Sequence, residues 1–126
     1  MNDTDFHSEQ ISLFNAFCER LRLLAAEPAG AGLAELSAQF ADLAGRPRDV
    51  MDEAPPLVAR MLTIAPQLAE HFPRDLLWYL GGECLHFMPD EEIERLTALD
   101  DQRRAAVSQG QDFNWREARA SALGLQ

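Results

Sequence analysis

A chain of 126 residues with 47% hydrophobic and 25% charged residues has the size and composition of about one globular domain. Its formal net charge of −10 repels phosphate backbones and anionic lipid headgroups, which disfavours binding to nucleic acid or to a membrane surface. All 11 basic residues are arginine, so lysine Schiff-base chemistry and a Walker-type phosphate lysine are excluded.

The sequence shows no membrane-spanning or secretory segment. It contains no run of about 18 apolar residues, which argues against a membrane span. Its acidic start lacks the basic and apolar regions of a secretory signal, so we expect a cytoplasmic protein. The bias toward alanine, leucine and arginine suggests a bacterial one. Cys18 and Cys84 form no Cys-x-x-Cys pair, and we expect buried thiols rather than a disulfide.

Helical periodicity is clearest at the beginning of the chain. Apolar residues recur at three- and four-residue steps over residues 8–26, which predicts a helix with Ser8 as its N-cap. We expect residues 1–7, approximately, to form a short flexible leader. A glycine- and proline-containing segment then ends the helix, and a second helix is predicted over residues 33–44.

Prolines make the middle of the chain less regular. We expect a short turn over residues 49–54, after which Pro55 and Pro56 open a helix that runs to residue 64. Pro66 either kinks that helix or starts a new one that runs to residue 72, because proline is tolerated in a first helical turn but not in an interior.

Three further helices are predicted in the second half of the chain, over residues 74–87, 89–108 and 112–123, the last capped by Asp112. Strand-like alternation is absent from the sequence. The predicted fold is therefore all-α, an irregular bundle of about six or seven short to medium helices in a single domain of residues 1–126. Phe113 and Trp115 either attach the last helix to this bundle or belong to a detachable arm.

Residues 78–93 are the most unusual segment. They include one of two tryptophans, the only tyrosine, one of two cysteines, one of three histidines and a glycine pair. On a continuous helix over residues 74–87, one stripe forms a core face of Leu77, Leu80, Gly81, Cys84 and Met88. A second stripe, either a solvated face or a site for protons or a cation, contains Asp75, Tyr79, Glu83 and His86.

Glu83 and His86 also match the Glu-x-x-His spacing of di-iron helical bundles. Such a centre needs two of these pairs, and the sequence contains one, although a symmetric dimer would supply the second. The pair is therefore a weak metal candidate, and we expect no metal and no cofactor.

The glycine pair and the acidic segment each allow more than one interpretation. Gly81 and Gly82 indicate close packing of another helix, which we favour, or a helix break, or room for a ligand beside Trp78. Residues 89–101 carry six acids against one arginine. These acids either stabilise the start of a helix or form an acidic docking face for a basic protein.

The sequence contains no Gly-x-Ser-x-Gly elbow and no glycine-rich phosphate loop, so it nominates no catalytic residue. We expect a small acidic regulatory or adaptor protein that is not an enzyme. Its partner would be another protein with a basic or apolar patch, or a second copy in a homodimer. The alternative is a binding protein or an enzyme that holds a metal or small ligand on the Tyr79, Glu83 and His86 face. The expected contact residues are Trp78, Tyr79, Gly81, Gly82, Glu83, His86, Asp90 and Glu91.

Overall fold

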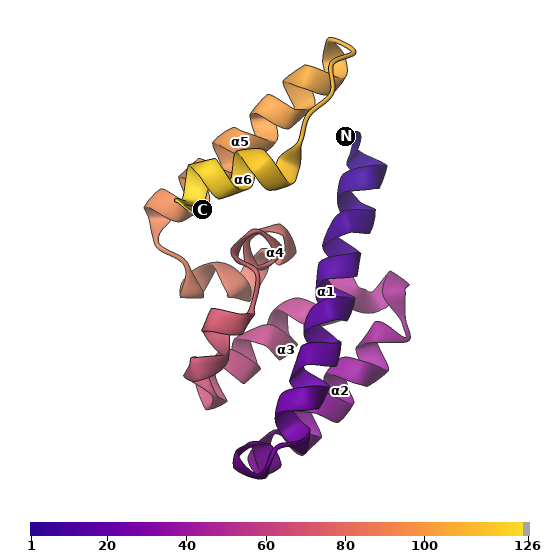
Figure 1. Ribbon diagram of the computed structural model, residues 1–126, viewed down its shortest axis with the longest axis vertical. Coiled ribbons are helices and arrows are strands. Elements are labelled where there is room, and N and C mark those ends of the chain that lie inside the picture. Colours follow the sequence, from indigo (N-terminus) through magenta and orange to yellow (C-terminus); the bar gives the residue numbers. More distant parts are fainter. Residues whose placement is uncertain (125–126) are drawn as a thin grey trace. The chain divides into compact units, whose positions relative to one another are not determined.

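The computed structural model describes residues 1–124, and this part of the chain consists of helices joined by short connections (Figure 1). The described residues form six α-helices and four short 3₁₀ segments, with no strand, which confirms the predicted all-α class. None of these helices is long and apolar enough to cross a membrane. In chain order the elements are α1 (Asp3–Ala26), η1 (Pro28–Leu33), α2 (Ala34–Ala44), η2 (Pro47–Asp49), α3 (Val50–Ile64), η3 (Pro66–His71), α4 (Arg74–Leu80), η4 (Gly82–Phe87), α5 (Asp90–Ser108) and α6 (Trp115–Leu123).

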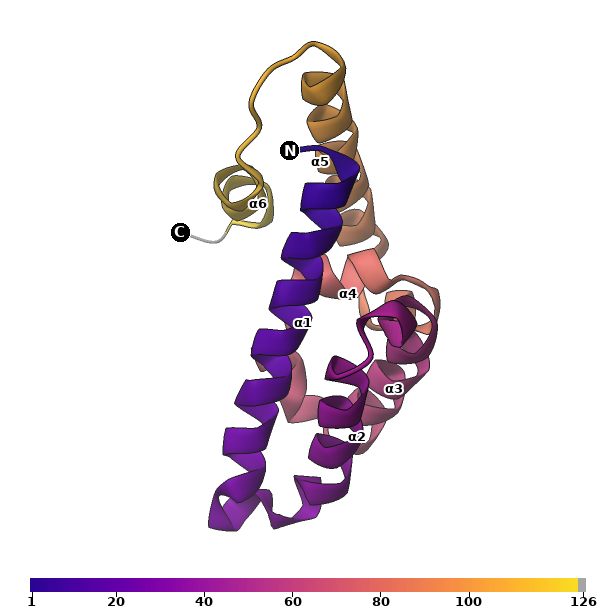
Figure 2. The same ribbon diagram turned by 90° about the vertical axis from the view of Figure 1, so that its right-hand side faces the viewer.

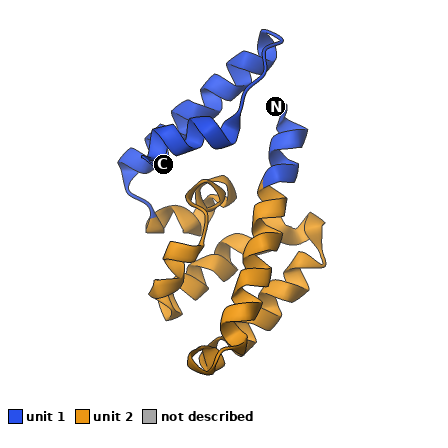
Figure 3. Cartoon of the chain, in the orientation of Figure 1, with its two compact units in different colours: residues 1–9, 88–126 blue, residues 10–87 orange. Residues whose placement is uncertain are grey.

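Packing divides the chain into two compact units (Figure 3). The internal unit comprises residues 10–87, and the terminal unit combines residues 1–9 with the chain from Met88 onward. Helix α1 supplies residues to both units because it runs through their boundary. The prediction of a single domain over residues 1–126 concerns whether the chain folds as one unit. Two compact units do not test this, and it stays a prediction.

Helix α1 begins earlier than the sequence suggested. Residues 3–7, expected as a flexible leader, form its first turns. The Asn2 side chain accepts a hydrogen bond from the Asp5 backbone N–H at 2.8 Å, so Asn2 rather than Ser8 occupies the capping position. Phe6 is buried and lies eight residues before Phe14, which extends the apolar stripe of the helix by two turns.

Helix α3 corrects the prediction for the prolines. Pro55 and Pro56 lie inside one continuous helix instead of opening a new one after a turn. Each proline removes the N–H that would bond the carbonyl four residues earlier. The helix nevertheless continues, because Val50, Ala54 and Val58 share one face that is fully buried. Burial of this face outweighs the two missing backbone hydrogen bonds.

An aromatic cluster forms part of the core of the internal unit. The Phe17 ring of α1 lies 5.6 Å from the Phe40 ring of α2 and 4.7 Å from the Phe72 ring, both in edge-to-face arrangements. Phe14 stacks on Phe40 from one turn earlier, at 5.9 Å. Such pairs contribute roughly 0.5–1.5 kcal/mol each beyond the burial of their surface, and here they hold α1 against α2.

A buried arginine organises the terminal unit. Arg103 of α5 is 1% exposed, and its guanidinium donates hydrogen bonds to Asp100 and Asp3, both at 2.8 Å, and to the Met1 carbonyl at 3.0 Å. The same guanidinium lies over the Phe6 ring, 4.5 Å from its centre. Arg103 therefore connects the first residues of the chain to the middle of α5.

Helix α6 lies against α5 (Figure 1), and its first residue completes the terminal core. Trp115 is 1% exposed and meets Phe6 edge-to-face at 4.6 Å, which confirms that it attaches the last helix. The cap is Asn114 instead of the predicted Asp112. Its side chain accepts a hydrogen bond from the Glu117 backbone N–H at 3.1 Å.

Replacing Arg103 with alanine should destabilise the protein by about 3 kcal/mol, because the buried Asp100 carboxylate loses its buried partner. The free energy of unfolding, measured in urea by circular dichroism, tests this. Arg104→Ala is the matched control. It removes a 65% exposed side chain from the same carboxylate and should cost less than about 1 kcal/mol. Equal losses in the two variants would contradict the assigned role of Arg103.

Candidate functional site

The glycine pair ends a helix. Helix α4 stops at Leu80, Gly81 has φ 66° and ψ −150°, Gly82 has φ 52°, and a 3₁₀ turn follows. The prediction of one helix over residues 74–87 is therefore wrong. A Cβ added at either glycine would meet no atom closer than 3.7 Å, so the favoured explanation, close packing of another helix, is also wrong. Positive φ, which other residues rarely adopt, explains both glycines.

The break also separates the residues of the predicted polar face. Tyr79 lies on α4, whereas Glu83 and His86 lie on η4, so the three do not share one helical face. Asp75, expected on the same face, is 1% exposed. It accepts a hydrogen bond from the buried Gln10 side chain at 3.4 Å, and it belongs to the core.

The remaining predicted contact residues divide between the two units. Trp78 and Tyr79 are half-buried in the internal unit, while Gly82, Glu83 and His86 are exposed there. Asp90 and Glu91 are exposed in the first turn of α5, in the terminal unit, as the dipole argument predicted.

The acidic segment is less uniformly exposed than its composition suggested. Asp100 is buried and pairs with Arg103 at 2.8 Å and with Arg104 at 3.2 Å. Among residues 1–124, no group of three or more histidine, cysteine, aspartate and glutamate side chains is placed to hold a metal ion.

Both cysteines are buried, free thiols, as the sequence predicted. Cys18 lies 3.5 Å from the Phe40 carbonyl oxygen, and Cys84 lies 3.7 Å from the Pro55 carbonyl oxygen. Burial raises the pKa of each thiol to about 12, so both stay protonated near neutral pH. A protonated, buried thiol is a poor nucleophile, and these residues serve packing.

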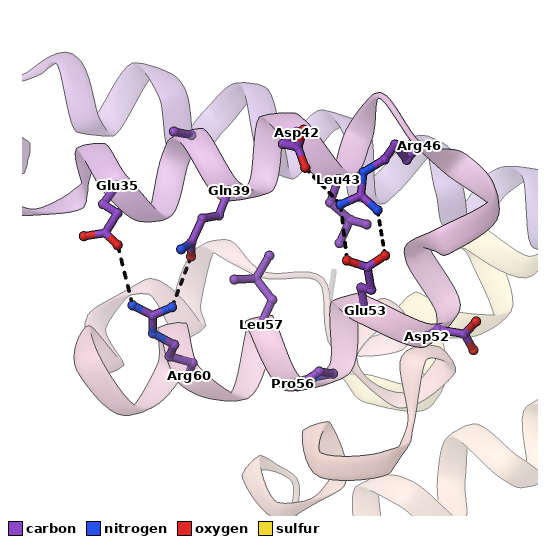
Figure 4. A pocket seen from close by; sticks show the side chains of 11 residues that line it. Glu35, Gln39, Asp42, Leu43, Arg46, Asp52, Glu53, Pro56, Leu57 and Arg60 are labelled. Atoms are coloured by element: carbon purple, nitrogen blue, oxygen red, sulfur yellow. Dashed lines mark hydrogen bonds and ion pairs between the residues drawn. The ribbon is translucent and has the colours of Figure 1, made fainter.

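A surface concavity of the internal unit lies elsewhere, between α2 and α3. These helices lie side by side (Figures 1 and 2), joined by a short connection through Gly45 and η2. The groove between them has a volume of about 680 Å³. Figure 4 shows the side chains that line it, which are Glu35, Ala38, Gln39, Asp42, Leu43, Arg46, Asp52, Glu53, Pro56, Leu57 and Arg60.

The middle of the groove is apolar and its ends are charged (Figure 4). Leu57 lies between the two charged clusters, and Ala38, Leu43 and Pro56 complete the apolar lining. Leu43 is 1% exposed and joins the core beneath, whereas Leu57 is half-buried and accessible from the groove. An apolar centre with a charged rim is the usual organisation of a protein interface.

One end of the groove is closed by Arg46. Its guanidinium forms ion pairs with Glu53 at 2.6 Å, Asp49 at 2.8 Å and Asp42 at 2.9 Å. Hydrogen bonds to Glu53, Asp49 and Asp42 raise the pKa of Arg46. Because Asp42 belongs to α2 and Glu53 to α3, a single side chain ties the two helices together here.

The other end is held more loosely, by Arg60. Its guanidinium donates a hydrogen bond to the Gln39 side-chain oxygen at 3.3 Å and lies 4.0 Å from the Glu35 carboxylate. The Arg60 and Glu35 side chains are 52% and 80% exposed. An exposed pair at this distance contributes little to stability, so the Glu35 carboxylate is available to another cation.

Carboxylates outnumber arginines around the groove. Glu35, Asp42, Asp52 and Glu53 line it together with Arg46 and Arg60, which leaves a surplus of two negative charges. Within the part of the chain that the structure describes, the Asp52 carboxylate forms no hydrogen bond or ion pair. Glu35 and Asp52 are the two carboxylates of the groove that Arg46 does not hold.

Sequence reasoning missed this groove. The helix predicted over residues 33–44 ends just before Arg46, and the spacing of acids around this arginine carried a signal. Acids stand four residues before Arg46 and three and seven residues after it, which suits ion pairs across a helix–turn–helix connection.

The sequence pattern of the PA2817-like family matches residues 6–126. The chain belongs to the PA2817-like family. The match includes all residues of the α2–α3 groove and all eight predicted contact residues. No curated protein and no solved structure matches the chain.

Replacing Gly81 with alanine should lower the free energy of unfolding by about 1–2 kcal/mol, because alanine is strained at φ 66°. D-alanine, introduced at this position by chemical synthesis, favours positive φ and should restore most of the loss. Gly32→Ala is the control, since its added Cβ meets nothing within 4 Å, and stability should be unchanged or slightly higher. If D- and L-alanine cost the same, backbone strain is not the reason for this glycine.

Both thiols should resist Ellman's reagent in the folded protein, at least about a hundredfold more than in urea, where two equivalents react. The raised pKa also fixes a pH dependence. Burial stabilises the neutral thiol, so this contribution is complete below about pH 9 and is lost as pH rises toward 12. Urea unfolding at successive pH values should show a shallower decline for Cys84→Ala than for wild type. Fast labelling of either folded thiol would refute the assignment.

Proposed function

We propose that this chain is a small acidic regulatory or adaptor protein, non-catalytic and cytoplasmic, that binds another protein through the α2–α3 groove. The observation that carries the proposal is the groove itself, with its accessible apolar centre at Leu57 and its surplus of acid on the rim. These features complement the basic or apolar patch expected of a partner.

The distribution of polar groups favours a protein over a small ligand. Small-molecule pockets fix their ligand with a few convergent polar groups set among apolar walls. Here the charged groups lie at the two ends, and Arg46 and Arg60 direct their guanidiniums toward carboxylates of the rim (Figure 4). The groove also follows two helices, which suits the docking of a segment along its length.

The net charge of the chain also favours a protein partner. A net charge of −10 steers basic partners toward the molecule and repels nucleic acid. The segment from Trp78 to Glu91 stays a predicted contact surface, and a homodimer stays a predicted assembly. The mass of the protein in solution, measured by light scattering, distinguishes a homodimer from binding to a different protein.

Ala38→Arg should abolish partner capture. Ala38 is exposed on α2 and lines the groove, so an arginine there fills the groove and offsets its negative charge. Tagged wild type and variants are expressed in the source cells, and captured proteins are quantified by mass spectrometry. A partner should be recovered with at least about tenfold lower yield by Ala38→Arg, which corresponds to about 1.4 kcal/mol.

Ala41→Arg is the matched control for that experiment. It places the same residue on an exposed position of α2 outside the groove. Both changes replace alanine with another good helix former, so circular dichroism should show both variants folded. Equal recovery of the partner by Ala38→Arg and Ala41→Arg would refute the groove as the binding site.

A further inference from the structure

We propose that the groove accepts a short helical segment of the partner. This segment carries one cationic side chain on each side of an apolar one. The cations would bind Glu35 and Asp52, and the apolar side chain would cover Leu57. This inference rests on the proposed function and specifies the chemistry of the ligand.

The first step concerns which carboxylates are available. Asp42 and Glu53 are held by Arg46 at 2.9 and 2.6 Å, and a partner would have to break several ion pairs to reach them. Glu35 has only the 4.0 Å contact with Arg60, and Asp52 is exposed without an ion pair in the described chain. Two incoming cations would neutralise the surplus charge.

The second step concerns spacing. Asp52 and Arg60 stand eight residues apart on α3, which corresponds to roughly 12 Å at the rise of an α-helix. Arg60 marks the Glu35 end of the groove, because it lies beside that carboxylate. Two side chains seven residues apart on a ligand helix are separated by roughly 10 Å. Long, flexible arginine side chains span the difference between this separation and that of the two carboxylates.

The third step concerns the conformation of the ligand. An extended segment gains main-chain hydrogen bonds when it adds to a sheet edge, and the described residues contain no strand that would provide one. A helix satisfies its own backbone groups and needs only side-chain contacts. Leu57 lies between the two charged ends, so the apolar side chain belongs three or four positions after the first cation.

The probe is an alanine-rich helical peptide with arginines seven positions apart and leucines three and four positions after the first arginine. Binding is measured by isothermal titration calorimetry and fluorescence anisotropy at two salt concentrations. The double variant Glu35→Gln/Asp52→Asn should bind about five- to tenfold more weakly, because two exposed ion pairs are lost. Its affinity should also depend less on salt.

Glu94→Gln/Asp101→Asn is the matched control. It removes the same charge from exposed positions outside the groove and should change the affinity less than about twofold. On the peptide, moving the arginines to five positions apart, or replacing the leucines with alanine, should weaken binding. Spermidine, a flexible cation without an apolar side chain, should compete poorly.

Several results would overturn the inference. They are failure of the probe to bind, equal loss in the control variant, indifference to arginine spacing, and competition by spermidine at the affinity of the peptide. Its failure is distinguishable from failure of the proposed function. If Ala38→Arg loses the cellular partner but the peptide binds the Glu35→Gln/Asp52→Asn variant as tightly as wild type, only this inference is wrong. If the peptide needs both carboxylates but Ala38→Arg still recovers the cellular partner, the proposed function is wrong.

Discussion

The groove depends on one side chain that joins the end of α2 to the start of α3. Arg46 bridges Asp42, Asp49 and Glu53, and without a cation at this point the three carboxylates would repel one another across the turn. The bridge is partly exposed and screened by salt, so its contribution is geometric more than energetic. Burial of the adjacent Leu43 supplies the apolar stabilisation, and Arg46 selects the arrangement of the two helices.

Arginine is used in two ways in this acidic protein. Arg103 is removed from water and matched by Asp100, Asp3 and a backbone carbonyl, and this satisfies its donors inside the core of the terminal unit. Arg46 instead pairs with Asp42, Asp49 and Glu53 at the surface, where its guanidinium is partly exposed. These two arginines together pair with five carboxylates. Glu35 and Asp52 of the α2–α3 groove are not among them.

Helix breakers gave opposite outcomes at two positions. Gly81 and Gly82 end α4 because the chain there has positive φ, a local requirement that matches one of the three interpretations of the glycine pair. Pro55 and Pro56 are equally strong breakers, yet α3 continues through them. Their cost is two missing hydrogen bonds, and burial of Val50 and its neighbours outweighs that cost. Residue type alone does not show whether burial outweighs the lost hydrogen bonds.

The sequence by itself determined the all-α class and the positions of α2 and α5, because local periodicity depends on side chains a few residues apart. It also predicted the buried thiols from cysteine usage, whereas it left the attachment of Trp115 as one of two alternatives. It misplaced the start of α1, the course of the chain around Gly81 and the face shared by Tyr79 and Glu83. The sequence did not predict the groove. Glu35 and Arg60 are 25 positions apart in the sequence, and only the tertiary packing of α2 on α3 brings them together. A site formed across two helices depends on how their buried faces fit, and that fit is a property of the whole core.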